Sequence, residues 1–124
     1  MAFVGLRDVK SMITASDLSG SAYRIVRTVA GRIAGATAGS QVPTGILTEE
    51  VADGSVTATE VGVCVSGRTK VRCGGTFADG ALLMADADGE AIAATATNYH
   101  VARAVEDGVD NQIIECVIDI GQLN

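Results

Sequence analysis

Much of this chain alternates between apolar and polar residues with a period of two, which is the pattern of strands that cover one face. The alternation is clearest over residues 23–29, 56–66 and 113–120. In the last segment, Ile114, Cys116, Ile118 and Ile120 alternate with Ile113, Glu115, Val117 and Asp119. This segment is therefore predicted to be a half-buried final strand.

A hairpin over residues 79–95 is predicted from the sequence Asp88-Gly89, which lies between two apolar runs. A type I′ turn needs positive φ at both central positions, and Gly and Asp tolerate this best. Counting outward from a two-residue loop puts Leu83, Ala85, Ile92 and Ala94 on a core face and Leu82, Met84 and Ala93 on the opposite face. We expect the second set to be available for contact with a neighbouring subunit.

Shorter apolar segments between turn residues complete the pattern. Residues 45–48 form a short predicted strand after the single proline, Pro43. The turn residues 66–68 predict a second hairpin, which would bring Cys64 near Cys73. Residues 99–105 fit either a strand or one helical turn. Eight or so short strands, glycine-rich turns and almost no helix predict an all-β fold, a small compact barrel or sandwich.

The first 21 residues differ from the rest because large apolar side chains are concentrated there. These are Phe3, Val4, Leu6, Val9, Met12 and Ile13. Three of them, Leu6, Val9 and Ile13, have helical spacing, so a short amphipathic helix is one interpretation. Others are a strand or helix that closes the domain's own core, an arm that docks on a neighbour, and a disordered terminus. We divide the chain into an N-terminal arm, residues 1–21, and a β domain, residues 22–124.

Composition favours association with other copies. The chain has 124 residues, 48% of them apolar, but only four aromatic side chains and 15 glycines. Small side chains bury little area each, at roughly 25 cal/mol per Å², and glycine adds entropy to the unfolded chain. We therefore expect the domain to gain stability by self-association.

Charge and hydropathy exclude two classes of partner. The formal net charge is −6, and the nine basic residues are scattered, which argues against a nucleic-acid surface. No apolar run approaches the roughly 20 residues of a membrane span, and the start of the chain lacks a signal-peptide pattern. We expect a protein that is made in the cytoplasm and does not enter a membrane.

Few residues are suited to catalysis or metal binding. The single histidine, His100, could form a nucleophilic pair with Cys64, Cys73 or Cys116, or bind zinc with them, but no motif or close spacing supports either. A disulfide between the first two cysteines is geometrically conceivable, and buried free thiols are expected. No catalytic residue, metal or cofactor is predicted.

One acidic group invites comparison with a calcium loop. Asp86, Asp88 and Glu90 alternate beside Gly89, but the other positions of an EF-hand are missing. We therefore interpret these residues as a solvated hairpin tip.

The order of the motifs resembles that of the small capsid cement, or head decoration, proteins of tailed bacteriophages. A G-[IV]-L element is matched by residues 45–47, and a V-x-G-x-x-K-V turn by residues 65–71. A G-x-x-L-x-x-D-x-x-G-x-A pattern is matched by Gly80, Leu83, Asp86, Gly89 and Ala91. An A-x-A-[LV]-E element at residues 102–106 and the terminal Ile/Val strand complete a likeness that covers residues 21–120.

This resemblance implies a β-tulip-like fold and a structural role in the virion. Proteins of this family are commonly homotrimers bound outside the expanded head, so the implied partners are the major capsid protein and further copies of this chain. We expect the apolar residues of the N-terminal arm, together with Leu82, Met84 and Ala93, to make these contacts. The alternatives are another β-rich virion component, from the tail, a fibre or head completion, and a small ligand-binding or enzymatic domain.

Overall fold

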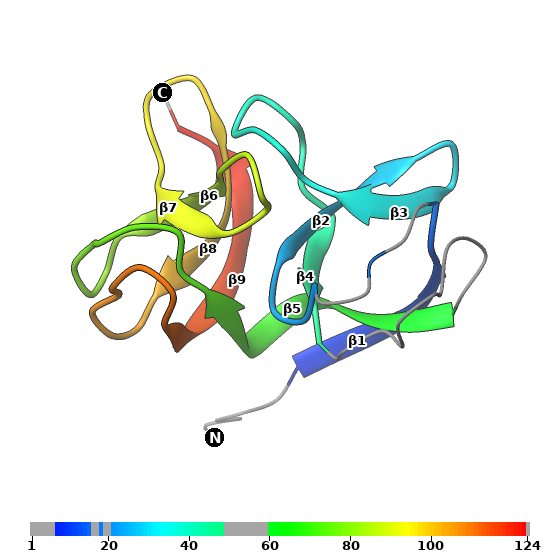
Figure 1. Ribbon diagram of the computed structural model, residues 1–124, viewed down its shortest axis with the longest axis horizontal. Coiled ribbons are helices and arrows are strands. Elements are labelled where there is room, and N and C mark those ends of the chain that lie inside the picture. Colours follow the sequence, from blue (N-terminus) through cyan, green and yellow to red (C-terminus); the bar gives the residue numbers. More distant parts are fainter. Residues whose placement is uncertain (1–6, 16–17, 19–20, 49–59, 124) are drawn as a thin grey trace.

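The computed structural model describes residues 7–15, 18, 21–48 and 60–123. Nine strands and no helix are present in these residues (Figure 1). The strands are β1 (Arg7–Ile13), β2 (Ile25–Val29), β3 (Arg32–Gly35), β4 (Gly45–Leu47), β5 (Glu60–Arg72), β6 (Leu82–Ala85), β7 (Ala91–Ala93), β8 (Tyr99–Ala104) and β9 (Ile113–Gln122). The predicted all-β class is confirmed. No helix in this part of the chain is long and apolar enough to cross a membrane.

All nine strands belong to one sheet that is organised around β5. The order is β3-β2-β4-β5-β9-β8-β6-β7, with β1 paired to β5 outside this path, and all these pairings are antiparallel. The first half of β5 pairs with β1 and β4, and its second half pairs with β9. As a result, β5 runs from one lobe into a second, and the two lobes lie side by side in Figure 1.

Each lobe is a partly closed barrel with its own core. In the N-terminal lobe, a parallel bridge from Thr14 to Ile33 joins the end of β1 to β3. In the C-terminal lobe, a parallel bridge from Cys73 to Ala91 joins the end of β5 to β7. The N-terminal core contains Leu18, Val26, Ile33, Leu47, Val61 and Val63. The C-terminal core is larger and takes in Ile25, Ala36 and Ile46 from the first lobe as well as residues of β5 to β9, so the two lobes share apolar contacts.

The predicted hairpin at residues 66–68 is wrong. Strand β5 continues through this segment for 13 residues, and Gly67 has a φ of 86°. Glycine adopts positive φ at little cost, so at this position it can redirect a strand without ending it. Cys64 lies within β5 and Cys73 directly follows its end, so the two are not paired across a hairpin. Both are buried, as is Cys116, and none of the three forms a disulfide.

The β6–β7 hairpin exists, but its predicted register is wrong by one residue. Leu83 pairs with Ala93, and Ala85 pairs with Ala91, so the loop has three residues, 87–89. Of the two turn residues, Gly89 alone has positive φ, at 78°. Leu83 and Ala85 face the core as predicted. Ile92 and Ala94, predicted to share that face, are only half-buried, and the fully buried residue of β7 is Ala91.

The N-terminal segment is a strand where it is described. Residues 7–13 pair with β5, so the amphipathic-helix interpretation is wrong for them. Met12 packs on the N-terminal core, while Val9 and Ile13 are 40% and 36% exposed. Elsewhere, residues 99–104 are a strand rather than a helical turn, and the short strand after Pro43 is confirmed as β4.

Candidate functional site

The residues that most often carry catalysis are buried and already bonded. His100 is 8% exposed, and its Nδ1 lies 2.6 Å from the carbonyl oxygen of Asp119. The Cys64 thiol donates a hydrogen bond to the carbonyl oxygen of Ser66 at 3.2 Å. Each group therefore serves the packing of the strands, and the burial of all three cysteines agrees with the expectation of buried thiols.

Burial also keeps the thiols of Cys73 and Cys116 protonated. Desolvation, reinforced by the nearby thiols of Cys64 and Cys73 and by Glu115, raises the pKa of Cys116 to about 12. Desolvation raises the pKa of Cys73 as well, against a lowering hydrogen bond from the backbone of Val109. The thiolate is the nucleophile and the metal ligand, so these cysteines are poorly suited to either role at neutral pH.

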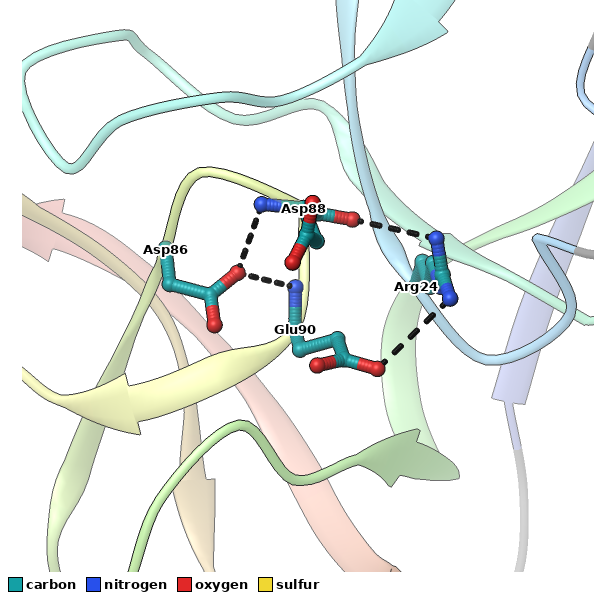
Figure 2. A network of polar contacts seen from close by, with 4 residues as sticks. All are labelled: Arg24, Asp86, Asp88 and Glu90. Carbon is teal, nitrogen blue, oxygen red and sulfur yellow. Dashed lines mark hydrogen bonds and ion pairs between the residues drawn. The ribbon is translucent and has the colours of Figure 1, made fainter. Parts of the chain in front are cut away.

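The acidic group of the β6–β7 loop is held by hydrogen bonds within the chain (Figure 2). One carboxylate oxygen of Asp86 accepts hydrogen bonds from the backbone N–H groups of Asp88, at 2.8 Å, and Glu90, at 2.9 Å. The carboxylate of Glu90 lies 3.6 Å from an Arg24 guanidinium nitrogen, and a second Arg24 nitrogen lies 3.5 Å from the Asp88 carbonyl oxygen. These bonds set the three-residue loop, which explains why a two-residue turn does not form.

This loop docks on the N-terminal lobe. The backbone N–H of Ile25 donates a 2.7 Å hydrogen bond to the carbonyl oxygen of Gly89, and Gly89 is buried. The interpretation as a solvated hairpin tip is therefore wrong except for Asp88, which is exposed. The ligand oxygens of Asp86, Asp88 and Glu90 lie within 4.8 Å of one another. Their existing bonds indicate a clamp between the lobes.

Of the contact residues expected in the N-terminal arm, the structure describes Val9, Met12 and Ile13. Phe3, Val4 and Leu6 lie outside the described residues. Val9 and Ile13 point away from the N-terminal core, and Met12 points into it. The pairing partner of Ile13 is Glu60, whose carboxylate accepts a 2.6 Å hydrogen bond from the Ser11 hydroxyl. The outward side of β1 therefore combines two exposed apolar side chains with a polar border.

The contact residues expected in the hairpin do not share one face. Leu82 is half-buried and pairs with Arg103 of β8. Met84 is half-buried, and its sulfur lies 3.6 Å from the Asn98 side-chain nitrogen of its own chain. Ala93 is exposed, on the face of Leu83. Because the register differs from the predicted one, Met84 and Ala93 are not brought together.

A further exposed surface was missed by reasoning from the sequence. Arg68, Val117, Arg103 and Leu82 form one cross-strand row over β5, β9, β8 and β6. We call the row and its neighbours Lys70, Arg72, Ile113, Glu115 and Asp119 the outer face of the C-terminal lobe. The alternation of Arg68, Lys70 and Arg72 is a sequence signal for this surface. It is not recognised when residues 66–68 are interpreted as a turn and not as part of one strand.

The comparisons with known proteins identify the fold. No protein-family model matches the chain, and no curated protein matches it. Among solved structures, the chain is similar to the N base of the head fibre gp8.5 of bacteriophage phi29, with a TM-score of 0.68 and 20% sequence identity. The likeness covers 96% of this chain and 99% of that chain. Both lobes and their connection through β5 therefore belong to one fold that the phage protein shares.

Proposed function

We propose that this protein is a structural component of a tailed-phage virion, attached to the outside of the head. The observation that carries this proposal is the likeness to the phi29 head-fibre base over nearly the whole of both chains. The order of motifs that resembles head decoration proteins agrees with it. The buried histidine and the protonated thiols favour a structural role over an enzymatic one.

The finer proposal is that the protein acts as a cement for the expanded shell. A head filled with DNA is under outward pressure, and contacts across subunit seams resist it. Several weak contacts made by one oligomer gain from effective concentration, and cyclic symmetry repeats each contact. A homotrimer bound to the major capsid protein would therefore stabilise the shell without any single strong contact.

Strand β1 is the proposed site of capsid contact. Val9 and Ile13 are exposed apolar side chains on a strand that, among the described residues, is paired along its length only with β5. An edge strand offers unpaired backbone groups together with alternate side chains, which is a frequent way of binding another chain.

The test is binding to purified, undecorated expanded capsids, scored by cosedimentation and by added density in cryo-electron microscopy. Deleting residues 1–17 would remove β1 and the inward side chain of Met12, so substitutions separate binding from folding better. We expect the double variant Val9→Lys/Ile13→Lys to lose capsid occupancy while keeping the wild-type melting temperature, because the lysine at position 13 lies opposite Glu60. The control is Val42→Lys, which changes a side chain that is 58% exposed elsewhere.

A wild-type protein that leaves capsids undecorated would contradict the cement role. Normal occupancy of the double variant would contradict only the placement of the contact on β1.

A fibre base is the second candidate, because the similar phage structure is itself the base of a head fibre. The two candidates differ in what projects from the bound protein. Density that ends at this domain, repeated over the shell, supports cement, whereas density that continues outward as a fibre supports a base.

A further inference from the structure

The outer face of the C-terminal lobe is basic, although the chain is acidic. Four of the nine basic residues lie on it, namely Arg68, Lys70, Arg72 and Arg103, against two acidic residues, Glu115 and Asp119. Two ion pairs hold part of this charge in place, from Arg68 to Glu115 at 3.0 Å and from Arg103 to Asp119 at 3.8 Å. The face keeps two positive charges in excess on a chain of net charge −6.

An exposed apolar side chain lies at the centre of this face. Val117 sits between Arg68 and Arg103 in the cross-strand row and is 37% exposed. Ile113 lies on the same side of β9, two residues before Glu115, and is 42% exposed. An apolar centre with a charged border is the usual composition of a protein interface.

A hollow of opposite charge lies at one end of the same lobe. It is lined by Thr76, Phe77, Ala78, Asp107, Gly108 and Val109. Backbone hydrogen bonds of 3.1 and 2.9 Å between Phe77 and Gly108 hold its two loops, residues 73–81 and 105–112, side by side (Figure 1). Val109 is 51% exposed at its wall.

The two loops that line the hollow carry acidic side chains and no basic ones, and Asp79, Asp107 and Asp110 are exposed. Glu106 is also exposed, and its carboxylate accepts a 3.0 Å hydrogen bond from the backbone N–H of Glu115 in β9. Arg103 of the outer face donates a 3.0 Å hydrogen bond to the carbonyl oxygen of Gly80 in the first loop. The Asp107 carboxylate accepts a 2.8 Å hydrogen bond from the backbone N–H of Asp79, which fixes one side of the border. The hollow is thus an apolar depression inside an acidic rim, and the outer face is an apolar centre inside a basic rim.

We propose that the outer face of one copy seats on the acidic hollow of a second copy of this chain, with Val117 packed against Phe77 and Val109. This proposal rests on the self-association that belongs to the proposed function, and it names the surfaces. The two patches differ, so the contact is heterologous, and copies that repeat it form a ring when the rotation closes. Opposite charges on the two rims favour this docking over contacts between like patches.

A second copy is a better occupant of the outer face than a nucleic acid. Glu115 and Asp119 lie among the basic residues, and two of the four cations are already paired with them. Phosphate binding needs basic side chains free of such carboxylates. The second copy supplies both the acidic rim and the apolar depression in one surface.

The experiment is sedimentation equilibrium of the full chain at low and high salt, with Val117→Asp compared with Val29→Asp. Both valines lie in strands and are 37% exposed, so the two substitutions are matched in residue type, secondary structure and exposure. We expect Val117→Asp to raise the dissociation constant of self-association at least about tenfold, since it places a charge in an apolar contact. Val29→Asp should change it less than about twofold.

A charge exchange tests the pairing of the two surfaces. Lys70→Glu and Asp110→Lys should each weaken association, and the double variant should recover part of the loss because the rims are again opposite in sign. Circular dichroism melts establish that every variant is folded.

A wild-type chain that stays monomeric, or a Val117→Asp variant that associates like wild type, overturns the interface. Equal weakening by Val29→Asp, or a double variant weaker than both single variants, overturns it too. The cement role is tested separately by capsid occupancy. Capsids decorated by a monomer would overturn this interface alone. An oligomer that forms through this interface but does not bind capsids would overturn the cement role alone.

Discussion

Replacing Gly45 with alanine is expected to destabilise the sheet where three strands come closest. Gly45 lies in β4 and pairs with Val26 of β2. A Cβ atom at this position would overlap the carbonyl oxygen of Cys64 in β5 and lie 2.9 Å from a methyl carbon of Val63. Both neighbours are fully buried in strand β5, so neither can move away freely. This contact gives a physical reason for the glycine of the G-[IV]-L motif.

The chain also contains a matched control. Gly35 of β3 pairs with the same residue, Val26, from the other side, and a Cβ atom there would meet nothing within 4 Å. In an open strand position, alanine is more stable than glycine by roughly 0.5–1 kcal/mol because it restricts the unfolded chain. Overpacking a tight core position costs about 1–3 kcal/mol, and overlap with backbone lies at the upper end. We expect Gly45→Ala to destabilise by about 2–3 kcal/mol and Gly35→Ala to be neutral or stabilising by up to about 1 kcal/mol.

The assay is urea unfolding, followed by circular dichroism, with the slope of the transition compared between variants. A lower midpoint with an unchanged slope reports a change in native-state stability. The reasoning would be refuted if Gly45→Ala unfolded within about 0.5 kcal/mol of wild type, or if Gly35→Ala lost as much stability as Gly45→Ala.

Three further predictions concern the clamp, the thiols and the proposed assembly. Arg24→Met should lower the free energy of unfolding by about 1–2 kcal/mol, because its partner Glu90 is largely buried. The control Lys10→Met breaks an exposed ion pair and should change this free energy by less than about 0.5 kcal/mol. Equal effects of the two variants in urea unfolding would contradict the clamp. The fold raises the pKa of the Cys116 thiol from 9.0 to about 12, so the unfolded chain loses the thiol proton at a lower pH than the folded chain does. The free energy of unfolding should therefore fall between pH 9 and pH 12, by up to about 1.4 kcal/mol per pH unit. Cys116→Ala should flatten this slope, and an unchanged slope would contradict the assignment. Met84→Asp should impair assembly, measured by sedimentation, more than folding, measured by thermal melts; a normal oligomer would refute a contact at this residue.

Several parts of the fold follow from local patterns. The alternation over residues 113–120 predicts a half-buried strand, and in β9 Ile114 and Cys116 are buried, whereas Ile120 of the same alternating set is 42% exposed beyond a register shift in the pairing with β8. Leu83 and Ala85 are likewise found in the core as their spacing predicts. These predictions hold because a strand with one covered face repeats its side chains every two residues, whatever its partners are.

The candidate surfaces depend more heavily on contacts between distant residues. The sequence motif at residues 65–71 reads as a turn, yet Gly67 redirects β5 from one lobe into the other, and the outer face exists only because the strand continues. The position of Arg72 beside Ile113 comes from pairing between strands that are far apart in the chain. Such pairings leave no local signal in one sequence.

The β6–β7 hairpin shows the same division. By itself the sequence determined that a turn lies near Asp88-Gly89 and that small apolar strands flank it, because positive φ and period-two alternation are local properties. Its register rests partly on local bonds from the Asp86 carboxylate to two backbone N–H groups of the loop, and partly on tertiary contacts, because Ile25 and Arg24 bind the loop from the other lobe. A shift of one residue exchanges the faces of a strand, so these contacts also decided which side of β7 faces the core.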